Sequence, residues 1–156
     1  MRLRTGRALS TPAMAVRGGA RPVMLATFDV PFAADATSVA VDSAVETGQP
    51  LTVVNVAEVP LGPCSTVLGY GYVGSEELEL ELRRPAELAA SLGVAVERLR
   101  VCSPHPVDAL LQLVAERTPG LLVVGPDPRR LRSRFYRRAA RRLRERAGCL
   151  VWLADP

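Results

Sequence analysis

Five short apolar segments alternate along this chain with longer segments of helical periodicity. The apolar segments are residues 22–29, 51–56, 94–102, 121–125 and 149–153. Residues 121–125 (LLVVG) are apolar throughout, which is typical of a central strand buried on both faces. Residues 94–102 (VAVERLRVC) alternate apolar and polar side chains, which predicts an edge or half-covered strand. The pattern therefore predicts five strands.

Four segments between these strands carry apolar residues at helical spacing. They are residues 33–46, 75–92, 106–116, and an Arg-rich segment whose apolar stripe runs from Leu131 to Leu143. Gly48 suits the end of the first helix, and Pro106 suits the first position of the third. Pro85 predicts a kink or a split in the second helix. The alternation over 78–82 (LELEL) also fits a strand, so that alternative stays open there.

Strands that alternate with helices predict an α/β fold. We expect three layers, with a five-stranded parallel sheet, right-handed crossovers and helices on both faces. Sheets of this kind bind ligands beyond the carboxyl ends of their strands, where the strand order reverses. The residues that follow Phe28, Val56 and Val124 are therefore the expected site, and Asp29, Gly125 and Asp127 are among them.

Two segments fall outside this pattern. Residues 1–20 carry Arg with Ser, Thr, Pro and Gly, and their apolar stretch is interrupted at 10–12. A signal peptide needs an uninterrupted stretch of about 7–15 apolar residues, so we expect a flexible tail here and a cytoplasmic protein. An Arg-rich targeting peptide is the alternative. The domain is expected to cover residues 21–156. Residues 61–74, rich in Gly, predict a mobile flap. No apolar run reaches the roughly 20 residues that a membrane helix needs.

Positive charge is concentrated in the Arg-rich helix. The net charge is +4 and all 20 basic residues are Arg, ten of them within 129–146, where Glu145 is the one acid. Genomic base composition and local binding chemistry are the two alternative explanations of the all-Arg usage. Cations at the start of a helix are unfavourable without a nearby anion. The four Arg residues there raise the hypothesis of an anionic ligand: Arg129, Arg130, Arg132 and Arg134. A solvated face, paired with the acids of 76–81, is the interpretation we favour.

Few residues suit catalysis. The cysteines Cys64, Cys102 and Cys149 are odd in number and widely spaced, which does not indicate a disulfide framework. The single histidine, His105, precedes a predicted helix and is expected to cap it, so no zinc site is predicted. No Ser-His-Asp or Cys-His pattern indicates a nucleophile. We therefore expect a protein that is not an enzyme.

The order and spacing of these segments over residues 21–153, apart from 61–74, resemble the universal stress protein family. Residues 104–125 resemble its helix followed by an apolar strand ending in Gly, and 147–153 its last strand. The resemblance implies a Rossmann-like sheet of order 3-2-1-4-5, of the adenine-nucleotide hydrolase type. It implies a stress-response or regulatory domain that forms a homodimer through the last strand. An enzyme of the wider hydrolase group is an alternative that fold alone does not license.

The same resemblance assigns roles to individual residues. Asp29 stands where the family commonly has an Asp that contacts adenine; the alternative is that it is a cap or turn residue before the first helix. By the same resemblance Val56 lines the adenine slot; the alternative is that it is a core residue. ATP-binding members have G-x-x-G after the fourth strand, then Gly-Ser or Gly-Thr about nine residues later, because glycines let amide groups close on phosphates. This chain keeps Gly125 but has Pro128 at the second glycine.

Two further departures weaken the phosphate-binding loop. Pro126 and Pro128 lack amide donors, and Arg137 and Arg138 stand at the Gly-Ser position. We therefore expect no standard ATP binding. A nucleotide or another small anion bound in a non-standard way, by Arg129 and Arg130, is one alternative. Nucleic-acid binding by the Arg-rich helix is the other, and it is disfavoured because few aromatic residues accompany the Arg.

Overall fold

Helices and strands alternate along the part of the chain that the structure, a computed structural model, describes: residues 21–59 and 76–155. In order they are β1 (Val23–Thr27), α1 (Ala34–Thr47), β2 (Leu51–Glu58), α3 (Glu76–Ser91), β3 (Val96–Ser103), α4 (Pro106–Arg117), β4 (Leu121–Val124), α5 (Ser133–Arg146) and β5 (Leu150–Leu153). The predicted tail over 1–20 and the predicted flap over 61–74, with Cys64, lie outside the described residues. The predicted alternation is confirmed.

The five strands form one parallel sheet in the order β3-β2-β1-β4-β5. This confirms the order that the family resemblance implied. The chain runs outward from β1 through β2 to β3, then returns to place β4 against the other side of β1. The strand order therefore reverses between β1 and β4, where Val23 pairs with Leu121 and Ala26 with Val124. Ligands of such sheets bind beyond this reversal.

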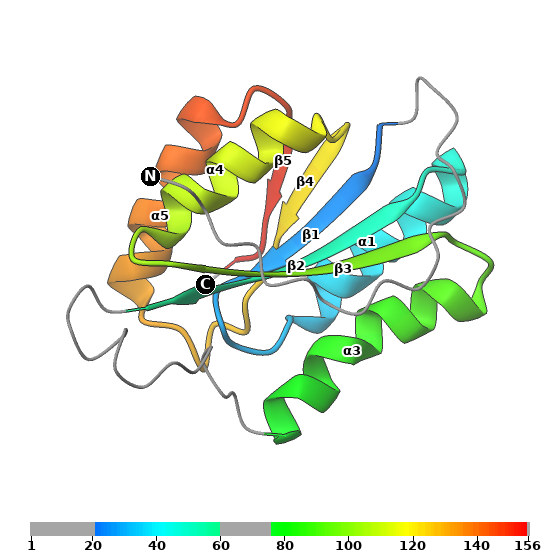
Figure 1. Cartoon of the computed structure of the whole chain (residues 1–156), viewed down its shortest axis with the longest axis horizontal. Helices are drawn as coiled ribbons and strands as arrows, with labels where there is room; N and C mark the ends of the chain where they lie inside the picture. Colours follow the sequence, from blue (N-terminus) through cyan, green and yellow to red (C-terminus); the bar gives the residue numbers. More distant parts are fainter. Residues whose placement is uncertain (1–20, 60–75, 156) are drawn as a thin grey trace.

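Helices cover both faces of the sheet, with α1 and α3 on one side and α4 and α5 on the other (Figure 1). Side chains of β1 alternate between the two layers because successive residues of a strand point to opposite faces. Met24 and Ala26 belong to the core under α4 and α5, and Val23 and Leu25 to the core under α1 and α3. The half-buried β3 is an edge strand, as its alternating sequence predicted.

The structure decides one open alternative, at 78–82, and corrects three expectations. The segment 78–82 is helical and not a strand, and α3 continues through a buried Pro85 without a split. Strand β2 ends at Glu58, two residues later than expected. The acids of α3 do not pair with the Arg-rich helix, because α3 lies on the opposite face of the sheet; Glu79 pairs instead with Arg83 and Arg98.

The Arg-rich helix α5 docks through its apolar stripe, as predicted. Tyr136, Ala139 and Leu143 are buried against the sheet, and most Arg side chains are exposed. The Tyr136 hydroxyl donates a 2.6 Å hydrogen bond to the Ala154 carbonyl, just after β5. This bond ties the first half of α5 to the carboxyl edge of the sheet. No helix that the structure describes combines the length and the hydropathy of a membrane span.

Candidate functional site

The loops that follow β1 and β4 run side by side beyond the strand-order reversal. The Gly125 amide donates to the Ala26 carbonyl (3.1 Å), and the Gly125 carbonyl accepts from the Ala33 amide (2.9 Å). One step further, the Asp127 amide donates to the Pro31 carbonyl (2.8 Å). The expected edge therefore exists, and the loops carrying the predicted residues are joined there by backbone hydrogen bonds.

Asp29 occupies a turn at the end of β1 and is held by a neighbouring strand. Its φ of 56° lies in the left-handed region, which Asp tolerates better than most residues. Its amide donates to Asn55 Oδ1 (2.8 Å), and Asn55 Nδ2 donates back to Asp29 Oδ1 (3.3 Å). The carboxylate that the family resemblance assigns to adenine is thus engaged through one oxygen. Asn55 was missed in the sequence, although a buried amide in the apolar run LTVVNV was a usable signal.

Gly125 permits α1 to pack directly against the end of β4. A Cβ atom at this position would lie 1.9 Å from Ala36 Cβ and 3.4 Å from Ala36 Cα. Its φ lies outside the left-handed region, so the absence of a side chain, and not backbone freedom, is what this position needs. Contact between Gly125 and a ligand remains a prediction.

The loop from Gly125 to Leu131 has no amide to offer a phosphate. Pro126 and Pro128 carry no N–H. The amide of Arg129 donates to Asp127 Oδ1 (2.9 Å), and the amides of Arg130 and Leu131 donate to the Asp127 carbonyl (3.0 and 3.3 Å). With Gly125 and Asp127 bonded as above, every N–H of this loop has a protein acceptor. A triphosphate cradle needs several convergent free amides, so these residues do not fit one.

The remaining predicted residues are divided among the core, the turn before α5 and α5 itself. Val56 is 1% exposed and belongs to the core under α4 and α5. Arg129 and Arg130 are exposed in the turn before α5, and Arg137 is exposed on the helix itself. Arg138 lines a separate cleft between α4 and α5. The structure therefore joins the β1 and β4 loops, and the four Arg residues are divided between the turn before α5 and α5 itself.

The described residues also bear on catalysis. They include no group of three His, Cys, Asp or Glu side chains that could hold a metal ion. Cys102 and Cys149 are free and half-buried, and burial raises the pKa of the Cys149 thiol, which disfavours the reactive thiolate. His105 sits at the N-cap position of α4, as predicted, but its side chain makes no capping hydrogen bond.

Comparisons with known proteins agree with this architecture. The model of the universal stress protein family matches residues 19–154. A universal stress protein solved in complex with cAMP is 23% identical, with a TM-score of 0.61 over 86% of this chain and 97% of its own. UspA from Lactobacillus plantarum is 19% identical, with a TM-score of 0.59 over 87% and 99%. The universal stress protein from Archaeoglobus fulgidus in complex with dAMP is 21% identical, with a TM-score of 0.54 over 86% and 98%. No curated protein matches the sequence significantly.

Proposed function

This chain belongs to the universal stress protein family, and we propose that it is a non-enzymatic, cytoplasmic regulatory member that does not bind ATP in the standard way. One observation carries the proposal: all five N–H groups between Gly125 and Leu131 already donate to protein acceptors. A bound triphosphate would have to break these bonds. Each amide would exchange a protein hydrogen bond, worth about 0.5–1.5 kcal/mol, for one to phosphate, so the loop offers a triphosphate no free donor.

Isothermal titration calorimetry with Mg-ATP tests this proposal. We expect no heat from an interaction tighter than about 1 mM, which corresponds to a binding free energy of about −4 kcal/mol. The Asp29→Ala variant is the matched control, because Asp29 is the residue that the family pattern assigns to adenine. A micromolar event with ATP that Asp29→Ala weakens would overturn the proposal.

A nucleotide or another anion bound near Arg129 and Arg130 is the second candidate function. Two observations favour it. Both side chains are exposed and make no ion pair among the described residues. The helix that follows, α5, begins without a side-chain cap and without an acid in its first turn, so its positive end is uncompensated there. Structural relatives solved with cAMP and with dAMP make a monophosphate the natural ligand to try.

Paired variants of equal charge test the second candidate. We expect Arg129→Gln/Arg130→Gln to abolish AMP binding and Arg132→Gln/Arg134→Gln, at the start of the same helix, to retain it. Equal weakening by both pairs would mean general attraction to a cationic surface and would remove this candidate. Binding of a nucleic acid would instead fall steeply as salt rises from about 50 to 200 mM.

We also propose that the protein forms a homodimer through β5. This strand is one edge of the sheet, and its Leu150 side chain is 71% exposed. Apolar edge strands tend to pair with another chain unless something covers them. A second copy of β5 would cover Leu150 and continue the sheet.

A further inference from the structure

Three apolar side chains are exposed where α1 and α3 end, at the edge of the sheet from which the strands start. Val45, in the last turn of α1, is 46% exposed, and Leu88 and Leu92, at the end of α3 and just after it, are 47% and 55% exposed. The two helices pack against each other on one face of the sheet (Figure 1). Val41, one turn before Val45, and Ala89, three residues before Leu92, are buried in the core under these helices. Val45, Leu88 and Leu92, the apolar patch, therefore continue this core onto the surface.

Negative charge surrounds the apolar patch. α1 and α3 together carry eight acids and two Arg, for a charge of −6, and neither helix has a basic residue in its last turn. The carboxyl end of a helix is the negative end of its dipole, so cations are favourable there. Asp42, Glu46 and Glu87, the acids of the last two turns, make no ion pair among the described residues. The apolar patch therefore fits a partner that is both apolar and positively charged.

The chain enters the sheet directly beside these helix ends. The Val23 amide, at the start of β1, donates to the Pro50 carbonyl in the loop after α1 (2.9 Å). The Leu51 amide, at the start of β2, donates to the Ala95 carbonyl in the loop after α3 (2.9 Å). The start of β1 and the loops that follow α1 and α3 thus lie in a row along one edge. The segment that precedes residue 21 is therefore attached next to the apolar patch.

Residues 1–20, which form this segment and lie outside the described residues, have a composition that matches the apolar patch. They contain four Arg and no acid, together with the apolar residues Leu3, Leu9, Met14 and Val16. Twenty residues span up to about 70 Å when extended, so the segment is long enough to reach the patch. Its tether gives it an effective concentration there on the order of 1 mM. A contact with a dissociation constant of only about 0.1 mM would then be occupied about nine-tenths of the time.

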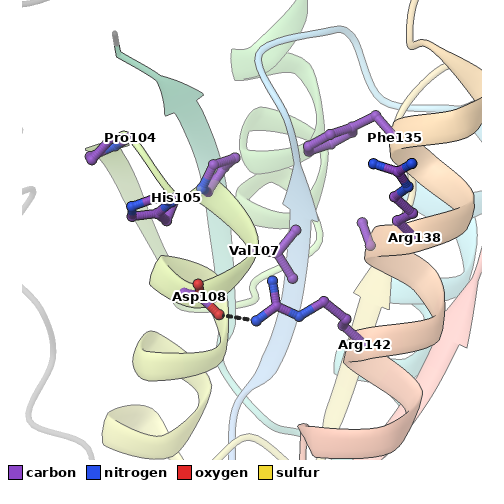
Figure 2. Close-up of a pocket in the computed structure, with 9 residues that line it drawn as sticks. Pro104, His105, Val107, Asp108, Phe135, Arg138 and Arg142 are labelled. Atoms are coloured by element: carbon purple, nitrogen blue, oxygen red, sulfur yellow. Dashed lines mark hydrogen bonds and ion pairs between the residues drawn. The ribbon is translucent and has the colours of Figure 1, made fainter. Parts of the chain in front are cut away.

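The opposite face of the sheet would repel the same segment. α5 carries seven Arg and one Glu, so this helix is strongly positive. The cleft between α4 and α5 is lined by Arg138 and Arg142, and its acid, Asp108, is already paired with Arg142 (Figure 2). Because like charges repel, this face disfavours a segment whose charged side chains are all Arg. Charge therefore directs residues 1–20 to α1 and α3.

We propose that residues 1–20 dock on the apolar patch. Their Arg side chains lie against the acids and the carboxyl ends of α1 and α3, and their apolar side chains cover Val45, Leu88 and Leu92. Gln49 Oε1, buried directly after the end of α1, has no donor among the described residues, and a guanidinium of the docked segment would supply one. While the segment is docked, it closes this face of the protein to other partners.

Amide NMR of the ¹⁵N-labelled full chain tests the proposal. In the wild type we expect the heteronuclear NOE of residues 2–17 to approach the values of the folded domain. One variant neutralises the cations of the segment: Arg2→Gln, Arg4→Gln, Arg7→Gln and Arg17→Gln. It should shift the equilibrium about tenfold or more toward the undocked segment, because each exposed ion pair contributes modestly and four are lost together. The amides of 42–49 and 88–95 should shift in the same variant. The matched control replaces the same four Arg by Lys, which keeps the charge, and it should remain docked.

A second matched pair of variants tests the apolar contact. Leu88→Ser should release the segment, whereas Leu80→Ser, on the same helix but near its other end and 61% exposed, should change the equilibrium less than twofold. A low NOE over 2–17 in the wild type would mean the flexible tail that the sequence predicted, and it would overturn the proposal. Equal effects of the two Leu variants, or of the Gln and Lys variants, would also overturn it. Docking that increases with protein concentration would place the segment on a second copy and would overturn docking within one chain.

Discussion

Replacing Gly125 by Ala tests what this glycine does. The new Cβ atom would lie 1.9 Å from Ala36 Cβ, whereas non-bonded carbon atoms settle about 3.5–4.0 Å apart. One side must therefore move by about 1.5–2 Å. Neither side moves freely, because Gly125 is hydrogen-bonded to Ala26 and Ala33 and the buried Ala36 lies in the first turn of α1.

The size of the effect follows from these contacts. Overpacking a well-packed core costs about 1–3 kcal/mol, and displacing α1 also strains the bond from the Ala33 amide to the Gly125 carbonyl, worth about 1 kcal/mol. We expect Gly125→Ala to lower the free energy of unfolding by about 3 kcal/mol. Urea unfolding followed by circular dichroism measures it, as a midpoint lower by about 1–3 M for a slope of about 1–3 kcal/mol per M.

A second substitution separates this clash from other causes. Ala36→Gly removes the clashing methyl group and leaves the new Cβ 3.4 Å from Cα of residue 36, which is a tolerable contact. Alone it should cost about 1–2 kcal/mol through helix propensity and lost burial. In the double variant it should restore most of the loss, whereas Ala40→Gly, also buried in α1, should not. A Gly125→Ala loss below about 0.5 kcal/mol, or equal effects of the two helix substitutions, would refute the reasoning.

Three further predictions concern other contacts. Tyr136→Phe should lower stability by about 1–2 kcal/mol in urea unfolding, since it leaves the Ala154 carbonyl without its donor. Burial raises the pKa of Tyr136 to about 12, so the folded state favours the neutral phenol. The resulting contribution to the free energy of unfolding is complete below pH 10 and is lost between pH 10 and about 12. This loss should be absent in Tyr136→Phe. Asp127→Ala should cost about 1 kcal/mol and accelerate hydrogen exchange at the Arg129 amide; unchanged exchange would contradict the bond to Asp127 Oδ1. Leu150→Arg should convert a dimer into a monomer in light scattering, and a monomeric wild type would refute pairing through β5.

The site could be predicted only in part. Its place at the carboxyl ends of the strands follows from the alternation of strands and helices, whereas the reversal between β1 and β4 depends on the strand order 3-2-1-4-5, which the family resemblance implied. The loss of phosphate-binding amides at Pro126 and Pro128 could also be predicted from the sequence, since proline lacks an N–H whatever its surroundings. Two of the remaining acceptors could not be predicted, because the Gly125 amide donates to Ala26 and the Asp127 amide to Pro31 across segments that only the fold brings together. The other three amides donate to Asp127, which is only two to four residues away in the sequence.

Periodicity and element order belong to the sequence itself. Apolar residues at intervals of two or of three to four specify which side of each strand or helix is buried, and this local pattern was enough for five strands, four described helices and the parallel sheet. Contacts between segments distant in the chain required the tertiary structure. The role of Gly125 depends on where α1 lies, and the engagement of Asp29 depends on Asn55, one strand away. The cleft between α4 and α5 depends on how closely two helices pack on one face, which no single segment encodes.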